Sequence, residues 1–290
     1  MIVLATLPLL VALAMSQALA TAGPDALPAT QVSAGGAARI PAERSDLLTH
    51  SPLSACSAGD APNVQAPQRS RIVTWNIRAA RSSPVDAIAA ELQAVQADVI
   101  ALQEVDVRTQ RAGFIDQPVA LATALGFHYV FAATIKWDEG DYGLAVLSRW
   151  PLTEVQRHRL TATAAGEPRI VLEVTVCAYG RPLRLFNHHA DGRATSRQRG
   201  FAELRAIVQA TVGHFVLVLG DFNEHSDAPG VRSLIDAGLV DLGAERNVNT
   251  ADRRIDYILA DDPLARLTSS ARVWPTDKSD HNALLVDLEW

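Results

Sequence analysis

The 290-residue chain is long enough for one large α/β domain or two small ones, and its 48% of hydrophobic residues suffices for a sizeable core. Its formal net charge of −6 counts against a dedicated nucleic-acid binder, because such proteins usually carry an excess of basic residues. A metal site or a local arginine cluster could still attract phosphate, so nucleic acid stays open as a substrate.

The first 20 residues form an uncharged segment that is rich in Leu, Val and Ala and ends in Ala18-Leu19-Ala20. This pattern predicts a cleaved signal peptide and export to the periplasm or the medium. No Lys or Arg precedes the apolar run, and the run approaches the length that spans a bilayer, so an uncleaved membrane anchor is the alternative. Residues 21–68 are rich in Ala, Pro, Ser and Gly and predict a flexible tether.

Cys56 and Cys177 are the only cysteines of the chain. In an oxidising compartment they could form a disulfide. Because one lies in the predicted tether and the other in a predicted strand, a disulfide and two unpaired thiols are equally expected. No C-x-x-C spacing occurs, so the sequence predicts no cysteine metal site.

One folded domain is predicted over residues 69–290. Strands are expected at 71–77, 98–104, 127–133, 142–148, 153–160, 169–178 and 181–189. One helix is expected to start at Ser83-Pro84, and a second, short helix is expected at 118–125. A helix at 195–210, a strand at 215–219, a short helix at 229–237 and strands at 254–260 and 283–290 follow. Hairpins mixed with helix-linked strands predict mixed β-sheets of the α/β or α+β class.

Polar side chains occur at a boundary of several of these apolar strands. They are Asn76, Glu104, Asn187, His189, Asp191, Asp221, Asn223, Asp256, Asp280 and His281. Taken singly, each has a plainer explanation as a turn residue or a solvated strand end. Because open sheets bind ligands at the ends of their strands, the complete set predicts one shared site.

The motifs TWNI, LQEVD, YGLAVLSR, FNHHAD, LGDFN, RIDYI and SDH occur in this order and together resemble the endonuclease/exonuclease/phosphatase superfamily, the deoxyribonuclease-I-like metal-dependent phosphoesterases. The resemblance covers essentially the whole predicted domain and implies a four-layer α/β/β/α sandwich of two mixed β-sheets. There are two departures. His188 stands where the family usually has Thr, and Asn282-Ala283 follow SDH where a Pro is common.

This resemblance and the chemistry of phosphate esters suggest roles for the set. Asn76, Glu104 and Asp280 are the expected metal ligands, for Mg²⁺ first and Mn²⁺ next, because hard cations prefer oxygen. The catalytic candidates are His189, Asp221, Asn223, Asp256 and His281, with Asp191 in support. Whether the general base is the Asp of LGDFN or the His of SDH stays open, as does the number of metal ions.

Arg108, Arg111, Trp137, Tyr142 and Asn187 are the candidates for binding substrate. The stretches around the first four resemble small bacterial hydrolases of the superfamily and the phosphatase-like domain associated with remodelling of glycosylphosphatidylinositol lipid anchors. We therefore expect an exported, monomeric, Mg²⁺-dependent hydrolase of a lipid head group or another small phosphodiester, acting at or near a membrane surface. The alternatives are a secreted nuclease and, from another class, a non-catalytic binding module.

Overall fold

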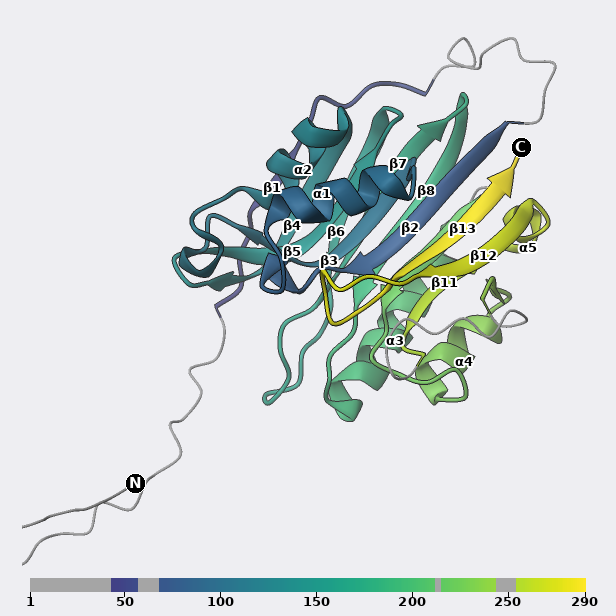
Figure 1. Ribbon diagram of the computed structural model, residues 1–290. Helices are drawn as coiled ribbons and strands as arrows, with labels where there is room; N and C mark the ends of the chain where they lie inside the picture. Colours follow the sequence, from purple (N-terminus) through teal and green to yellow (C-terminus); the bar gives the residue numbers. More distant parts are fainter. Residues whose placement is uncertain (1–42, 57–67, 212–214, 244–253) are drawn as a thin grey trace, which may run out of the picture. The chain divides into compact units, whose positions relative to one another are not determined.

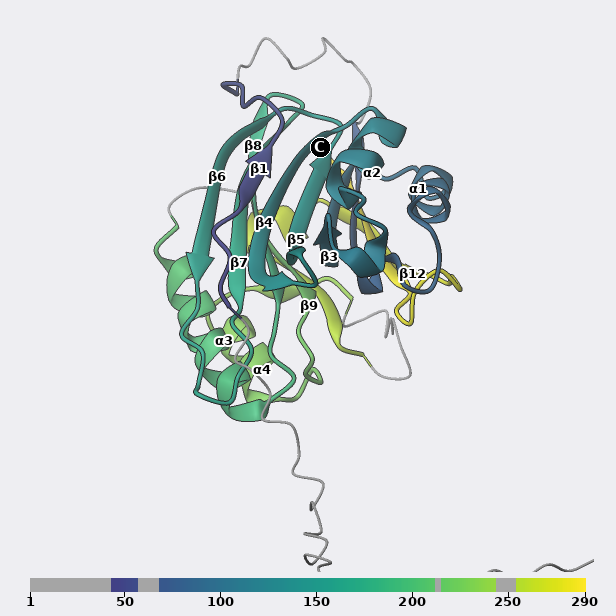
Figure 2. The same ribbon diagram turned by 90° about the vertical axis from the view of Figure 1, so that its left-hand side faces the viewer.

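The computed structural model describes residues 43–56, 68–211, 215–243 and 254–290, all of which lie in one compact unit, Pro41–Trp290. The predicted signal peptide or anchor and most of the predicted tether lie outside the described residues. Two β-sheets face each other, with helices on their outer faces (Figures 1 and 2).

The first sheet has seven strands, in the order β1 (Leu48–His50), β4 (His128–Trp137), β5 (Gly140–Ser148), β3 (Val99–Val107), β2 (Arg69–Asn76), β13 (Ala283–Glu289) and β12 (Thr268–Trp274). Of these neighbours, only β2 and β3 pair in parallel. Parallel strands end at the same edge of a sheet. Asn76 and Glu104 therefore reach the same edge.

The second sheet has six strands, in the order β10 (Val240–Asp241), β11 (Asp256–Ala260), β9 (Val216–Asp221), β8 (Arg181–His189), β7 (Ile170–Ala178) and β6 (Leu152–Arg159). The strands β7 and β8 form the antiparallel hairpin that the turn sequence predicts. β8 and β9 are parallel, so that His189 lies opposite Asp221, and Asp221 in turn lies opposite Asp256 on β11. Three site candidates thus form one row across this sheet.

Helices cover both sheets from outside. α1 (Val85–Ala94) and α2 (Gln117–Leu125) pack on the first sheet, and α3 (Ala194–Gln209) and α4 (Pro229–Ile235) on the second, while α5 (Asp262–Ala265) is a single short turn. A third apolar core lies between the sheets, where Val146 packs with Leu172, Leu185 and Leu217. The layers are therefore helix, sheet, sheet and helix, which confirms the predicted fold class.

Residues 43–56 belong to the fold, although the sequence predicts a tether there. β1 pairs with β4 at the edge of the first sheet, and Cys56 is disulfide-bonded to Cys177 at the end of β7. The sequence also gave no indication of β10 and β12, because a two-residue strand and the polar run TSSARVW lack the apolar signal of a buried strand. None of the helices among the described residues is long and apolar enough to cross a membrane.

Candidate active site

Local backbone geometry places Glu104 at the edge of the first sheet. The pairing of β3 with β5 shifts register between Leu102 and Val105, and Glu104 within this irregularity has φ +54°. Such bulges re-aim a side chain at the end of a strand. The preceding Gln103 points the other way, into the core, where its Nε2 donates to Asn187 Oδ1 at 2.7 Å.

A second backbone device places Asp221. Gly220 has φ +136°, and a Cβ at this position would lie 1.9 Å from the carbonyl oxygen of His188, so only glycine fits. Asn223 follows at φ +49°; its N–H donates to Asp221 Oδ1 at 2.9 Å and its Nδ2 to the carbonyl of Ala190 at 3.1 Å. Asn223 therefore joins the ends of β8 and β9.

Asp221 is the centre of the site. Its Oδ2 lies 3.0 Å from Asn76 Nδ2, 3.5 Å from His189 Nε2 and 3.7 Å from His281 Nε2. The residue is 2% exposed. Burial, followed by the charge of Asp256, raises the pKa of Asp221 to about 7, against the opposing effects of His281 and Asn76.

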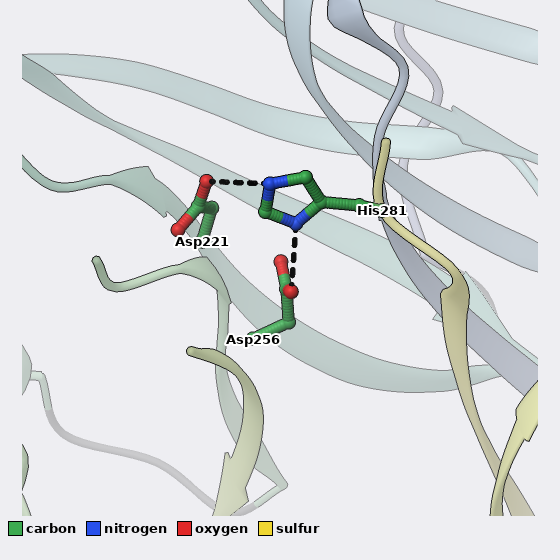
Figure 3. A group of neighbouring side chains, drawn as sticks. All are labelled: Asp221, Asp256 and His281. Atoms are coloured by element: carbon green, nitrogen blue, oxygen red, sulfur yellow. Dashed lines mark hydrogen bonds and ion pairs between the residues drawn. The ribbon is translucent and has the colours of Figure 1, made fainter. Parts of the chain in front are cut away.

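His281 lies between two carboxylates. Its Nδ1 donates to Asp256 Oδ2 at 2.9 Å, while Nε2 faces Asp221 (Figure 3). Burial works to lower the pKa of His281, but the hydrogen bond and charge of Asp256 outweigh it and raise this pKa to about 9. Trp75 Nε1 donates to the His281 carbonyl at 2.8 Å and fixes the loop before β13.

Asn76 connects the two sheets across the site. Its Nδ2 donates both to Glu104 Oε1 and to Asp221 Oδ2, at 3.0 Å each. The predicted third ligand, Asp280, lies apart from this bridge: its Oδ2 is 3.4 Å from Arg78 Nε, and its side chain is 51% exposed. Among the described residues, no hydrogen bond or ion pair joins Asp280 directly to Glu104 or Asn76, but Ser279 Oγ lies 3.3 Å from Asp280 Oδ1 and donates to the Asn76 carbonyl at 2.7 Å.

Two groups of residues are candidates for holding a metal ion. Asp221, Asp256 and His281 offer ligand atoms within 4.8 Å of one another. The contact between Asp256 and His281, however, is a hydrogen bond from the protonated Nδ1 of the ring. This nitrogen therefore has no lone pair with which to bind a metal ion. Glu104 fits a hard cation better, because it is half-buried and forms no ion pair with a basic side chain among the described residues.

Three of the residues predicted to bind substrate, Arg111, Trp137 and Tyr142, form a group that we call the Arg111 cluster and that we treat as the rim of the site. The Arg111 guanidinium lies 5.0 Å from the ring centre of Trp137 and 5.5 Å from that of Tyr142. Asp106 holds it with two hydrogen bonds of 2.7 Å. Arg108 is exposed, and in the part of the chain that the structure describes its side chain forms no hydrogen bond, ion pair or ring contact with the cluster.

The structure corrects the predicted role of Asn187. Its side chain is fully buried between the sheets, where Nδ2 donates at 3.0 Å to the carbonyls of Leu102 and Ala145. It cannot touch a substrate, and it ties the sheets together instead. Asp191 lies beside the loop before β7, where its carboxylate accepts the N–H of Glu167 and of Arg193 at 2.9 Å.

The two adjacent histidines have different environments. His188 packs against Phe201 of α3, and its Nδ1 lies 3.0 Å from the Ile170 carbonyl. Burial lowers its pKa to about 4. His189 is the one that faces Asp221, with its Nε2 3.5 Å from Asp221 Oδ2.

Two further residues of the site, the buried Asp106 and the largely buried Arg169, received no role from the sequence. Asp106 anchors the Arg111 cluster, and Arg169 Nη1 lies 3.2 Å from His189 Nδ1. Asp106 lies in the motif LQEVD, between the metal-ligand candidate Glu104 and Arg111. This position in the sequence could have indicated a role for Asp106 in the site. For Arg169 the signal is the hairpin register, since Val171 pairs with His188.

The sequence profile of the Endonuclease/Exonuclease/phosphatase family matches residues 73–281. The chain therefore belongs to this family, whose members are generally metal-dependent phosphoester hydrolases, and the resemblance of its motifs is confirmed. A comparison with curated proteins finds no significant match.

Several solved structures share the fold. An endonuclease/exonuclease/phosphatase from Beutenbergia cavernae is 22% identical with a TM-score of 0.63, covering 77% of this chain and 72% of that one. A mannosyl-6-phosphatase from Bacteroides thetaiotaomicron is 17% identical with a TM-score of 0.58, covering 75% and 98%. An AP endonuclease from Archaeoglobus fulgidus is 19% identical with a TM-score of 0.56, also covering 75% and 98%. At these identities the likeness concerns the fold alone.

Proposed function

We propose that this protein is an exported, Mg²⁺-dependent phosphoester hydrolase that cleaves its substrate by direct attack of water. The observation that carries this proposal is the convergence of three donors, from Asn76, His189 and His281, on Asp221 Oδ2. A site of this kind can orient a water molecule and bind the oxygens of a phosphate. Membership of the family supplies the reaction class.

Glu104 and Asn76 are the residues that would hold Mg²⁺, with Asp280 nearby on the loop before β13. When bound, a divalent ion would offset the negative charge of the phosphate and make a bound water more acidic. A carboxylate suits this ion because it offers a hard oxygen ligand. Asn76 would add an oxygen ligand only after its amide rotates, because its Nδ2 faces Glu104 and Asp221 and its Oδ1 accepts the N–H of Arg78 at 3.0 Å.

We infer that Asp221 is the general base. Both ring nitrogens of His281 face carboxylates, which leaves this imidazole no free acceptor for a proton from water. Asp221 is instead the acceptor on which the surrounding donors converge, so it orients the attacking water and takes its proton. Held by Asp256, His281 then donates from Nε2 to a phosphate oxygen, and His189 donates to another oxygen or to the leaving group.

The Arg111 cluster supports a substrate with a small phosphate-containing head group. Asp106 fixes the guanidinium in one orientation, which favours binding of an anionic oxygen. The loop after β3 exposes Phe114 to 57%, and the β4–β5 hairpin exposes Trp137 to 39%. A hydrogen bond of 2.8 Å from the N–H of Gln110 to the carbonyl of Asp138 joins this loop to the hairpin. A lipid head group or sugar phosphate would match such a rim better than duplex DNA.

The disulfide supports export. Disulfides persist in oxidising compartments outside the cytoplasm, and Cys56 is bonded to Cys177. Together with the uncharged N-terminal segment, this favours a periplasmic or secreted protein, with membrane attachment by an uncleaved N-terminus as the alternative.

The proposal is tested by assaying the purified protein with Mg²⁺ against bis-p-nitrophenyl phosphate, sugar phosphates, vesicles of phosphatidylinositol or sphingomyelin, plasmid DNA and RNA. We expect turnover of a lipid or small phosphoester, and a loss of about 100-fold or more in kcat/KM for His281→Asn. His128→Asn, outside the site, serves as the control. Cleavage of nucleic acid alone would identify a nuclease instead, and no turnover on any substrate would contradict the proposal.

A further inference from the structure

Arg169 lies immediately before β7 and contacts His189 on the side away from Asp221. Its Nη1 is 3.2 Å from His189 Nδ1 and 3.3 Å from Glu167 Oε1, and its side chain is 13% exposed. Burial raises the pKa of Tyr142, a member of the Arg111 cluster, while the positive charge of Arg169 acts on it in the opposite direction. The Nε of Arg169 is buried and has no hydrogen-bond partner among the described residues. A guanidinium in this position needs a reason beyond stability, because burying it is costly.

The contact with His189 determines where the imidazole proton sits. A guanidinium has donors only, so Nδ1 of His189 must accept the hydrogen bond through its lone pair. In the neutral ring the proton is then on Nε2, which faces Asp221 Oδ2 at 3.5 Å. The ring is also kept neutral, since burial first and the charge of Arg169 second lower the pKa of His189 well below its ordinary value.

The two histidines of the site are thus set in opposite ways. Asp256 accepts a hydrogen bond from the Nδ1–H of His281, whereas Arg169 donates a hydrogen bond to the lone pair on Nδ1 of His189. His281 is held as a cation with donors at both ring nitrogens. His189 is held as a neutral ring with a single donor, at Nε2.

We propose that Arg169 is a positioning residue that locks His189 in the neutral Nε2–H tautomer and so aims one N–H donor at the reacting phosphate. The inference rests on the proposed function, because the phosphate is the group that this donor would meet. It also gives an electrostatic link between the Arg111 cluster and the chemistry, since Tyr142 lies against the Arg111 guanidinium and is close enough to Arg169 to feel its charge.

The tautomer is measured directly by long-range ¹H–¹⁵N NMR on histidine-labelled protein without added metal. For the wild type we expect one His189 tautomer with Nδ1 unprotonated and Nε2 protonated. Arg169→Met removes the donor, so the Nδ1 resonance should shift and the Nδ1–H tautomer should become populated. Arg169→Lys keeps a donor and a charge, and should restore the Nε2–H form at least in part.

Arg197→Met is a matched control. Arg197 is also 13% exposed, and its guanidinium contacts Glu224 Oε1 at 3.2 Å and the Gly192 carbonyl at 2.8 Å, but no histidine of the site. The His189 resonances should stay unchanged in this variant. Thermal denaturation of all three variants establishes that each is folded.

Kinetics separate positioning from direct binding of substrate. Arg169→Met should lower kcat about 10- to 100-fold with little change in KM, because the His189 donor matters in the transition state. Unchanged ring nitrogens in the methionine variant would overturn the inference, and so would a raised KM at unaltered kcat. If the wild type hydrolyses no phosphoester, the proposed function fails, while the NMR result on metal-free protein still decides the tautomer.

Discussion

At the scale of single residues, the site depends on hydrogen bonds that give each side chain one orientation. Asp256 accepts a hydrogen bond from His281 Nδ1, and the Asp221 carboxylate lies 3.7 Å from its Nε2. The amide of Asn76 donates to the carboxylates of both Glu104 and Asp221. Such fixed donors and acceptors need no reorganisation when charge develops on a phosphate.

The partner of His281 gives the first prediction. Asp256→Asn keeps the shape of the side chain but removes the charge that stabilises the imidazolium, so kcat should fall about 100-fold or more. Steady-state kinetics with a chromogenic phosphodiester measure this effect, and circular dichroism verifies the fold. Unchanged kcat in a folded variant would show that the pair has no part in the reaction.

Most of the proposed catalytic residues can be found from the sequence, whereas partners such as Arg169 become evident only from the strand pairing. Asp221 and His281 occur in short motifs at strand ends, where the residue type itself indicates chemistry. Arg169 precedes an apolar strand and looks like any solvated strand end until the β7–β8 register brings it beside His189. The prediction that Asn187 binds substrate is wrong because its position in the motif does not show which face of β8 its side chain occupies.

At the scale of elements, the ends of β8 and β9 are shaped by backbone conformation. The tight approach of Gly220 to His188 sets the direction in which the following Asp221 leaves the strand. Most strands and helices could be predicted from apolar patterns. β1 and β12 could not, because they form by pairing at the two edges of the first sheet, and this pairing leaves no pattern in the local sequence.

Gly220→Ala tests this backbone device. The added Cβ would collide with the His188 carbonyl, so we expect a loss of about 3 kcal/mol in the free energy of unfolding and reduced activity. Gly113→Ala is the control: it shares a positive φ, +66°, but has no atom within 4 Å of the new Cβ, so it should cost only about 1 kcal/mol. Equal losses in the two variants by urea denaturation would contradict the steric explanation.

Asp287 ties three strands of the first sheet and gives a prediction on pH. Its fully buried carboxylate bonds Arg71 Nε on β2 at 2.7 Å and Arg272 Nη1 on β12 at 3.0 Å. Burial alone would raise its pKa, but hydrogen bonds from Arg71, Arg69 and Ser270 outweigh burial and lower this pKa well below the ordinary value. The carboxylate therefore stabilises the folded state above the pKa that Asp has in the unfolded chain, and this contribution is lost as pH falls through the lower folded value.

Asp287→Asn should accordingly lower the free energy of unfolding by about 3 kcal/mol near neutral pH. The difference from wild type should shrink as pH falls below about 4, where the unfolded wild type begins to bind the proton. Asp262→Asn, in an exposed i,i+4 pair with Arg266, is the control and should change stability little. A difference between Asp287→Asn and wild type that stays constant with pH would contradict this assignment.

At the scale of the whole molecule, one cross-link joins the N-terminal segment to the second sheet. The Cys56–Cys177 disulfide spans 121 residues, while β1 adds an edge strand to the first sheet. The sequence left this pairing open, because neither the length nor the composition of residues 21–68 shows that part of them returns to the sandwich.

Removing this cross-link should affect stability and leave the chemistry intact. The variant with both cysteines replaced by serine should lose about 4 kcal/mol in the free energy of unfolding, as expected for a long closed loop, yet keep its kcat. Denaturation of the wild type with and without reductant checks the same value. A large fall in kcat in the folded double variant would show that the cross-link also shapes the site.

The central claim is that side chains from both sheets act as one catalytic site. A double-mutant cycle on kcat/KM between Glu104→Gln, from the first sheet, and Asp221→Asn, from the second, tests it most directly. If both side chains act together through Asn76 on one phosphate, the kcat/KM of the double variant should be close to that of the less active single variant. Losses that multiply, as for two independent sites, would contradict the account.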